Sequence, residues 1–139
     1  METTPEQNKK TIVRFNREFI EQGKIETFNE LVADDVFNHS AAPGASTGAD
    51  GMFHFLQTVL KGGFPDLTVE IFDQIGEADK VTTRKAFYGT HTGEFLGIPP
   101  THKKMTLQVI EIVRLKDGKY AEHWGLSNLP AVLAELAAQ

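Results

Sequence analysis

Cysteine is absent from this sequence, and so are long uninterrupted runs of apolar residues. Without cysteine the chain can form no disulfide, no thiolate nucleophile and no cysteine-ligated zinc site. No apolar run approaches the roughly 20 residues that a membrane helix needs. The first ten residues, METTPEQNKK, also lack the apolar stretch of a signal peptide. We therefore expect a soluble cytoplasmic protein with no membrane partner.

An excess of positive charge is missing as well. Lys and Arg number 14 against 19 Asp and Glu, which gives a net charge of −5. Proteins that bind nucleic acids normally present a basic surface, so we expect no nucleic-acid partner. The 139 residues, 40% of them hydrophobic and ten of them Phe, predict a single folded domain over residues 1–139 rather than a disordered chain.

Apolar residues recur at helical spacing in four segments. The segments are residues 5–22, 25–33, 48–61 and 129–138. Thr4 before a proline is a suitable start for the first helix, and Gly23 is a suitable stop. Thr47 and Asp50 resemble a capping box at the start of the third helix.

Apolar and polar residues alternate along most of the second half of the chain, which indicates strands. The predicted strands are a brief one at residues 36–39 and four longer ones at 67–75, 81–92, 106–115 and 119–126. Asp117 and Gly118 give a hairpin signal between the last two. Helices segregated from strands that follow one another predict an α+β fold with an antiparallel sheet.

The strand at 106–115 is unusual because both of its faces carry apolar side chains. Val109 and Val113 lie on one face, and Ile110 and Ile112 lie on the other. A strand with one buried face should alternate with polar residues. We therefore expect the outer face of the sheet to be covered by a second copy of the chain.

A series of short motifs resembles the SnoaL-like polyketide cyclase family across about residues 8–137. The motifs are Asn38-His39, Pro43-Gly44, FPDL at 64–67, Asp79-Lys80-Val81 with Arg84, GTHTGEF at 89–95, GIPPT at 97–101, and Asp117-Gly118-Lys119 with Glu122-His123-Trp124. The resemblance implies an NTF2-like cone, in which a curved antiparallel sheet wraps around N-terminal helices and encloses a deep apolar pocket. It also implies a short C-terminal helix and a homodimer or larger assembly, built on the outer face of the sheet.

The resemblance further implies chemistry without metal or organic cofactor on a small hydrophobic, polyketide-like carbonyl compound. Cyclases of this family close a ring by an intramolecular aldol reaction. Such a reaction needs a base for a proton alpha to a carbonyl, and a donor that holds the enolate oxygen. The alternative is a domain on the same fold that binds a small molecule or a partner without catalysis.

Asn128 bears on that choice. The resemblance implies an acid/base Asp four residues after the motif tryptophan, and Trp124 places Asn128 there. An amide cannot accept the proton, although it can donate a hydrogen bond in a pocket. Asn128 also precedes the last predicted helix, where Asn is a preferred N-cap.

Two further residues complete the predicted catalytic set. His39 can act as a base near neutral pH, and with the Asp missing it is the leading candidate, unless it only bonds to its own loop. Arg84 offers a donor fork for a carbonyl or carboxylate, unless it lies on a solvated face.

The predicted substrate-binding residues are Trp124, His91, Glu111 and Tyr88. Trp124 would form a pocket wall or pack in the core, on the same face as Tyr120 and Leu126. His91 would bind substrate or pack on the end of the sheet. Glu111, between two isoleucines, would be exposed or a partly buried carboxylate with a raised pKa.

The histidines do not indicate a metal site. The five are scattered and lack the spacing of metal ligands such as H-E-x-x-H. His123 should lie on the face opposite Glu122, where it would meet either solvent or a second subunit.

Overall fold

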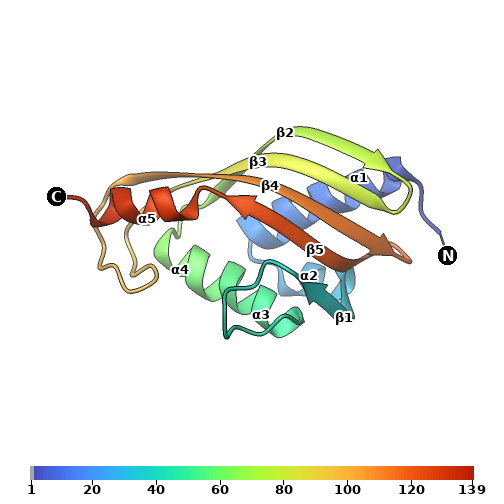
Figure 1. Cartoon of the computed structure of the whole chain (residues 1–139), viewed down its shortest axis with the longest axis horizontal. Coiled ribbons are helices and arrows are strands. Elements are labelled where there is room, and N and C mark those ends of the chain that lie inside the picture. The colour runs from blue at the N-terminus through green and yellow to red at the C-terminus, as the bar shows by residue number, and fades with distance from the viewer. Residues whose placement is uncertain (1) are drawn as a thin grey trace.

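The computed structural model describes residues 2–139 and shows a curved five-stranded sheet with helices packed against one face (Figure 1). The elements, in chain order, are α1 (Pro5–Arg14), η1 (Phe15–Glu21), α2 (Ile25–Leu31), β1 (Val32–Asn38), α3 (Ala49–Phe53), η2 (His54–Leu60), α4 (Lys61–Gly63), β2 (Thr68–Glu77), β3 (Lys80–Thr90), β4 (Lys104–Lys116), β5 (Lys119–Ser127) and α5 (Leu129–Ala137). The predicted α+β class is confirmed, and each of the four long strands ends within two residues of its predicted bounds.

The first helix begins where its sequence predicts. The Thr4 side chain accepts a hydrogen bond from the backbone of Gln7, and the Gln7 side chain bonds back to the backbone of Thr4. Helix α1 continues through the wider turns of η1 to Gly23, whose φ of +73° ends the helix as glycine can without strain. Ile12, Phe15 and Phe19 on its inner side are buried.

The capping box predicted for the third helix is wrong. The helix begins at Ala49 with Gly48 at its N-cap and without a side-chain cap. Asp50 accepts a hydrogen bond from the Ser46 hydroxyl at 2.6 Å instead. Ser46 therefore contacts Asp50 through side chains only, and the helix starts without the predicted cap from Thr47.

The sheet has the strand order β1-β5-β4-β3-β2. The four long strands are antiparallel, and Asp117 and Gly118 turn β4 into β5 with positive φ angles of 53° and 76°, as a tight hairpin requires. β1 is longer than predicted and pairs parallel to β5. Local strand patterns could not show this pairing, because the two strands are far apart in the chain.

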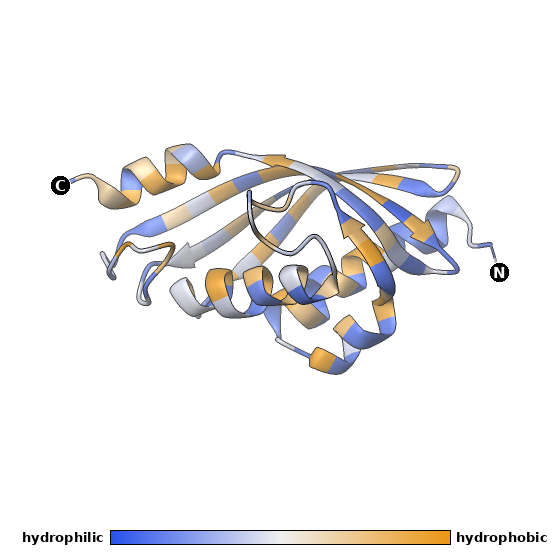
Figure 2. Cartoon of the chain, turned by 60° about the horizontal axis from the view of Figure 1, so that its bottom comes forward, coloured by the Kyte–Doolittle hydropathy of each residue, from blue (hydrophilic) through white to orange (hydrophobic). Residues whose placement is uncertain are grey.

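Side chains alternate strictly along β4. Leu107, Val113 and Leu115 face the helices and are buried, while Ile110 and Ile112 are 53% and 39% exposed on the outer face. Figure 2 shows hydrophobic and hydrophilic positions alternating along the strands. The sequence predicted these two apolar faces of β4.

A β-bulge changes the alternation in β5. Leu115 pairs with Tyr120, but Arg114 pairs with Glu122, so Ala121 is an extra residue. Tyr120 therefore packs in the core, with its ring centre 4.5 Å from that of Phe15. The prediction that Tyr120 and Trp124 share a face is wrong, because the bulge puts Trp124 on the outer side.

The core lies between the inner face of the sheet and the helices. Aromatic rings dominate it: Phe19 contacts Phe15, Phe28 and Phe53 with ring centres 4.8 to 5.6 Å apart. A second group joins Phe64 to Phe95. Burial of each such side chain contributes roughly 1.5–3 kcal/mol. No helix within residues 2–139 is long and apolar enough to cross a membrane.

Candidate functional site

The sheet sorts neighbouring residues onto opposite faces. Lys85, Glu111 and His123 point toward the helices, whereas Arg84, Ile110 and Trp124 point outward. The same division separates Asn38, which contacts His123, from His39, which stacks on Trp124. Two candidate sites result, one on each face.

We call the inner one the inner cluster; it comprises Asn16, Asn38, Lys85, Glu111 and His123. The side chains of Lys85 and Glu111 are 3% and 6% exposed, and Lys85 Nζ lies 3.1 Å from Glu111 Oε2. This contact is an ion pair whose geometry is not that of a hydrogen bond. Lys85 Nζ donates a hydrogen bond to Asn16 Oδ1 at 2.8 Å. Asn16 in turn donates to the backbone carbonyl of Ile12, which fixes its side chain.

His123 joins the other end of the cluster to β1. Its Nε2 lies 3.0 Å from Glu111 Oε1, and its Nδ1 lies 2.8 Å from Asn38 Oδ1. Asn38 Oδ1 also accepts a hydrogen bond from the backbone N–H of Ser40. Both expectations for His123, solvent or a second subunit, are wrong, because the ring faces the interior of its own chain.

The charges of the cluster decide the ionisation of Glu111. Burial would raise the pKa of this carboxyl, but the charge of Lys85, together with the hydrogen bond and charge of His123, outweighs burial and lowers the pKa to about 2. Glu111 is buried, so the exposed position is wrong, and the raised pKa of the buried alternative is also wrong, because the sequence did not show the two cations. Burial first, and then the charge of Glu111, raises the pKa of Tyr120 well above its usual range.

Two buried oxygens of the cluster region lack a hydrogen bond. Within residues 2–139, neither Glu111 Oε2 nor the Tyr120 hydroxyl has a hydrogen-bond partner. Buried polar groups are nearly always paired, so each unpaired one needs an explanation; a third such atom, His91 Nε2, lies outside the cluster. The inner cluster is therefore the strongest candidate for chemistry in the interior.

The cluster is enclosed but not sealed. The His123 side chain is 19% exposed. A Cβ atom at position 125 would lie 3.0 Å from His123 Cε1, so Gly125 leaves that edge of the ring uncovered. Apolar side chains that are only half buried come from η2, β4 and α5; they are Phe55, Leu56, Val59, Val109, Leu129 and Leu133. These side chains pack against the apolar core and surround the cluster with apolar groups.

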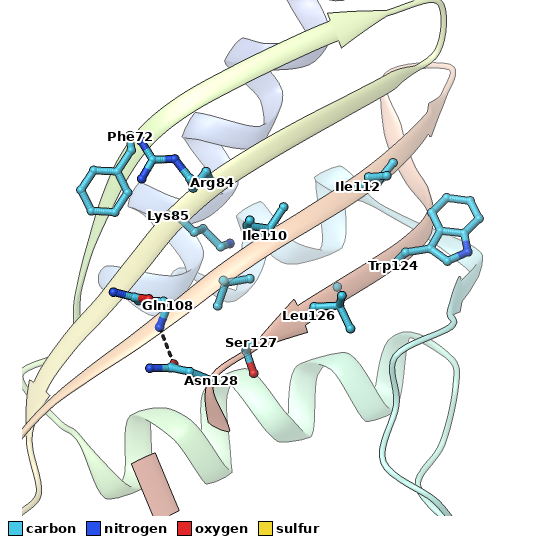
Figure 3. A pocket seen from close by; sticks show the side chains of 12 residues that line it. Phe72, Arg84, Lys85, Gln108, Ile110, Ile112, Trp124, Leu126, Ser127 and Asn128 are labelled. Atoms are coloured by element: carbon cyan, nitrogen blue, oxygen red, sulfur yellow. Dashed lines mark hydrogen bonds between the residues drawn. The ribbon is translucent and has the colours of Figure 1, made fainter. Parts of the chain in front are cut away.

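The second site, which we call the outer groove, is a shallow hollow of about 770 Å³ on the outer face of β2–β5 (Figure 3). Its walls include the apolar side chains of Phe72, Ile110, Ile112, Trp124 and Leu126. Lys85 also borders the groove, but its ammonium lies on the inner side, against Asn16 and Glu111. Leu126 is 83% exposed. Exposed apolar surface that is continuous over several strands is typical of an interface.

Most of the predicted catalytic residues lie at this outer groove. Its lining includes Arg84 and Asn128. His39 stacks on Trp124 with its ring centre 4.7 Å away and an interplanar angle of 2°. The structure thus brings His39 and Trp124 together, but on the face opposite Glu111.

His39 and Arg84 are each paired with a carboxylate. His39 Nε2 lies 2.7 Å from Glu122 Oε2. That contact, with a hydrogen bond from Arg114, lowers the pKa of Glu122. Arg84 donates to Asp73 at 2.7 Å and lies over the ring of Phe72.

Asn128 stands at the N-cap position of α5, as predicted, but its side chain does not cap the helix. Its Oδ1 accepts the backbone N–H of Gln108 at 2.7 Å (Figure 3). The backbone N–H of Asn128 also donates to the carbonyl of Gln108 at 3.2 Å, so Asn128 exchanges two hydrogen bonds with Gln108 and extends the pairing of β4 and β5. The Ser127 hydroxyl accepts the N–H of Leu129 instead.

Tyr88 and His91 lie away from the inner cluster. Tyr88 is on the outer face and donates to Glu70 at 2.7 Å, a hydrogen bond that raises the pKa of Tyr88. His91 is fully buried beside Phe64, and its Nδ1 accepts the N–H of Thr101. This is the packing position that the sequence allowed as the alternative to substrate binding.

Lys85, Asn16, Asn38 and His123 were not selected from the sequence. Alternation along β3 puts Lys85 on the same face as Val81 and Phe87, which are buried, so a lysine on an apolar face was the available signal. Within residues 2–139 no three His, Asp or Glu side chains are grouped so that they could hold a metal ion.

The chain matches the SnoaL-like polyketide cyclase family over residues 10–136. It is 31% identical over 49 residues to nogalonic acid methyl ester cyclase of Streptomyces nogalater; that match spans 35% of this chain and only 37% of the cyclase. Wild-type IdmH of Streptomyces antibioticus superposes with a TM-score of 0.82 at 31% identity, covering 95% of this chain and 99% of its own. TsrD of Streptomyces laurentii has a TM-score of 0.86 at 22% identity over 99% of this chain and 100% of its own, and so shares the fold.

Proposed function

The chain belongs to the SnoaL-like polyketide cyclase family, and from that membership we propose a cofactor-independent enzyme that acts on a small hydrophobic carbonyl compound at the inner cluster. The observation that carries the proposal is the ion pair of Lys85 and Glu111, bridged to His123 inside an apolar interior. Burial of such a cluster lowers stability, because each desolvated ion costs several kcal/mol. A role in function explains why the chain keeps these charges in its interior.

The cluster offers what an aldol closure needs at its charged stage. Loss of an α-proton leaves negative charge on the enolate oxygen, and cations in a low-dielectric interior stabilise that charge. The enolate carbon then bonds to a second carbonyl carbon of the same molecule. The resulting alkoxide takes a proton from solvent and the α-proton leaves to solvent, so the step balances while the cations of the cluster hold the negative charge.

Each remaining member of the cluster has a positioning role. Glu111 and Asn38 hold the two ring nitrogens of His123, so the ring cannot turn. Asn16 holds the ammonium of Lys85. Fixed donors and charges are effective in catalysis because they need no reorganisation during the reaction.

A binding protein without catalysis is the second candidate. Two observations favour it: Asn128 stands where the family resemblance implies an acid/base Asp, and its side chain is committed to Gln108. His39, the base predicted from sequence, is paired with Glu122 on the outer face. Its role as a base remains a prediction, now for a ligand in the outer groove.

A panel of aromatic polyketides and cyclic ketones separates the two candidates. Binding is measured by thermal shift and turnover by loss of substrate. The enzyme hypothesis expects turnover that His123→Gln abolishes and His39→Ala leaves intact, since only His123 lies inside. Loss of turnover in His39→Ala alone would move the site to the outer groove. Binding across the panel without turnover would establish the binding protein.

We also propose a homodimer or larger assembly built on the outer groove. Leu126, Ile75 and Ile110 are 83%, 69% and 53% exposed on that face. A second sheet packed there would bury them, and a two-fold axis allows one patch to cover its own copy. Light scattering that gave the monomer mass at micromolar concentration would contradict this assembly.

A further inference from the structure

We infer that the inner cluster carries one net positive charge and takes its ligand as an anion, the enolate, phenolate or carboxylate of an acidic carbonyl or phenolic compound. The inference rests on the proposed function only in placing the ligand inside the cone. It goes beyond it because it specifies the charge with which the ligand binds.

The hydrogen bonds of Asn38 fix the orientation of its side-chain amide. The backbone N–H of Ser40 points at Asn38 Oδ1 from 3.0 Å. A backbone N–H can only donate, so this atom of Asn38 must be the carbonyl oxygen and not the amide nitrogen. The same oxygen lies 2.8 Å from His123 Nδ1. Nδ1 therefore carries a hydrogen.

The other ring nitrogen of His123 faces a carboxylate. Nε2 lies 3.0 Å from Glu111 Oε1, and the neighbouring ammonium of Lys85 keeps Glu111 ionised. A carboxylate only accepts, so Nε2 also carries a hydrogen. With both nitrogens donating, His123 is an imidazolium in this arrangement.

The charges of the inner cluster sum to one net positive charge. Lys85 and His123 are positive, Glu111 is negative, and the two asparagines are neutral. The groups that face the cluster from the surrounding elements are also uncharged: Asn16 on η1, Asn38 on β1, Ser40 in the following loop and the hydroxyl of Tyr120 on β5. The charged side chains of Arg84, Arg114 and Glu122 are on the outer face, where they pair with one another or with Asp73 and His39.

Such a cluster holds negative charge better than it creates it. His123 has no free lone pair, Lys85 is an ammonium, and Glu111 is held ionised between two cations, which makes it a weak base. A ligand that enters already ionised needs no strong base and finds the field that stabilises it. A buried positive charge in low dielectric discriminates strongly between an anion and a neutral molecule of the same shape.

Matched inert probes test the inference. We would measure binding of 2-naphthoate and its uncharged isostere 2-naphthamide to the full chain by calorimetry at pH 7. The expected result is that naphthoate binds at least about tenfold more tightly, as roughly 1.4 kcal/mol of charge preference requires. Equal affinities, or tighter binding of the amide, would overturn the inference. The excitation spectrum of bound 2-naphthol tests whether a carboxylate is needed, because it reports ionisation in the ground state. A naphtholate band shows that an oxyanion without a carboxylate suffices. A band of neutral naphthol restricts the site to carboxylates.

Charge variants assign the preference to the cluster. Lys85→Gln removes the net charge while keeping an amide that can reach Asn16, and it should abolish the preference for naphthoate. Lys80→Gln is the matched control: it removes a lysine from the same strand, but from an exposed position, and the preference should remain. An unchanged preference in Lys85→Gln would overturn the inference.

A second measurement covers the case in which Lys85→Gln does not fold. A long-range ¹H–¹⁵N spectrum of the wild-type protein at pH 7 should show both ring nitrogens of His123 as N–H nitrogens. A neutral tautomer would contradict the inference. None of these readouts depends on turnover, so a protein that binds anions without reacting them would refute the enzyme proposal and leave this inference standing.

Discussion

On its inner face the sheet encloses Lys85, Glu111 and His123, whereas on its outer face it exposes Ile110, Ile112 and Leu126. Each face therefore departs from the usual distribution, in which charges meet water and apolar side chains are buried. Both departures need a reason, and the two reasons differ. Buried charge points to ligand chemistry, and exposed apolar surface points to a covering partner.

The two faces also differ in how their charged residues are satisfied. The inner cluster forms one connected network from η1 through β3 and β4 to β1. The outer face carries separate pairs such as Arg84 with Asp73, which are half exposed. Exposed pairs contribute about 0–1 kcal/mol, so removal of one partner should have very different effects on the two faces.

The largest expected effect follows from breaking the inner ion pair. Glu111→Ala leaves Lys85 and His123 buried without their carboxylate and should lower the free energy of unfolding by about 3–5 kcal/mol. Asp73→Ala, the matched break on the outer face, should lower it by about 1 kcal/mol or less. Urea unfolding measures both changes. Similar losses from both variants would show that the inner cluster is no more constrained than the surface.

The second largest effect should be a loss of folding stability in acid, caused by protonation of Glu111. The pKa of Glu111 is about 2 in the fold against an ordinary value of 4.5, so the folded chain binds fewer protons than the unfolded chain in this range. The stabilisation is complete above pH 4.5 and is lost as the pH falls toward 2, by up to about 3 kcal/mol. Glu111→Gln should flatten this part of the profile. An unchanged slope would mean that other carboxylates cause the acid loss.

The outer face should respond to charge through assembly and not through folding. Leu126→Lys places a charge in the proposed interface and should raise the dimer dissociation constant by at least about 30-fold, or 2 kcal/mol. Because Leu126 is exposed in the single chain, monomer stability should stay nearly constant. Sedimentation across a concentration series measures the dissociation constant. A change in folding stability with an unchanged dissociation constant would place Leu126 outside the interface.

The smallest effect is expected at the end of β5. Asn128→Ala removes the acceptor for the Gln108 N–H and should cost about 1 kcal/mol, while Asn128→Asp keeps an acceptor and should cost little. Neither should alter binding inside the cone, because Asn128 lines the outer groove. Thermal unfolding and the naphthoate titration measure the two properties. If Asn128→Asp produced α-proton exchange in a bound ketone, the side chain would have to reach the interior.

Local sequence signals determined much of this protein. The Thr4 cap, the stop at Gly23, the Asp117-Gly118 hairpin and the bounds of the four long strands all follow from patterns within a few residues. The apolar pattern on both sides of β4 also followed, because side chains alternate along any strand. These features depend on neighbours in the chain, and a sequence shows those directly.

Only the tertiary structure decided which face each residue occupies. Alternation relates Lys85 to Arg84 and His123 to Trp124, but it does not say which of each pair is inside. The extra residue Ala121 then reverses the alternation within β5, and no local pattern marks a bulge.

The inner cluster depends on contacts between distant parts of the chain for the same reason. Asn16 is 69 residues from Lys85, and Asn38 is 85 residues from His123. The parallel pairing of β1 with β5 brings Asn38 to that histidine, and α1 with η1 brings Asn16 beneath the sheet. The pKa of Glu111 reversed its expected direction because the charges that lower it arrive only when these elements pack together.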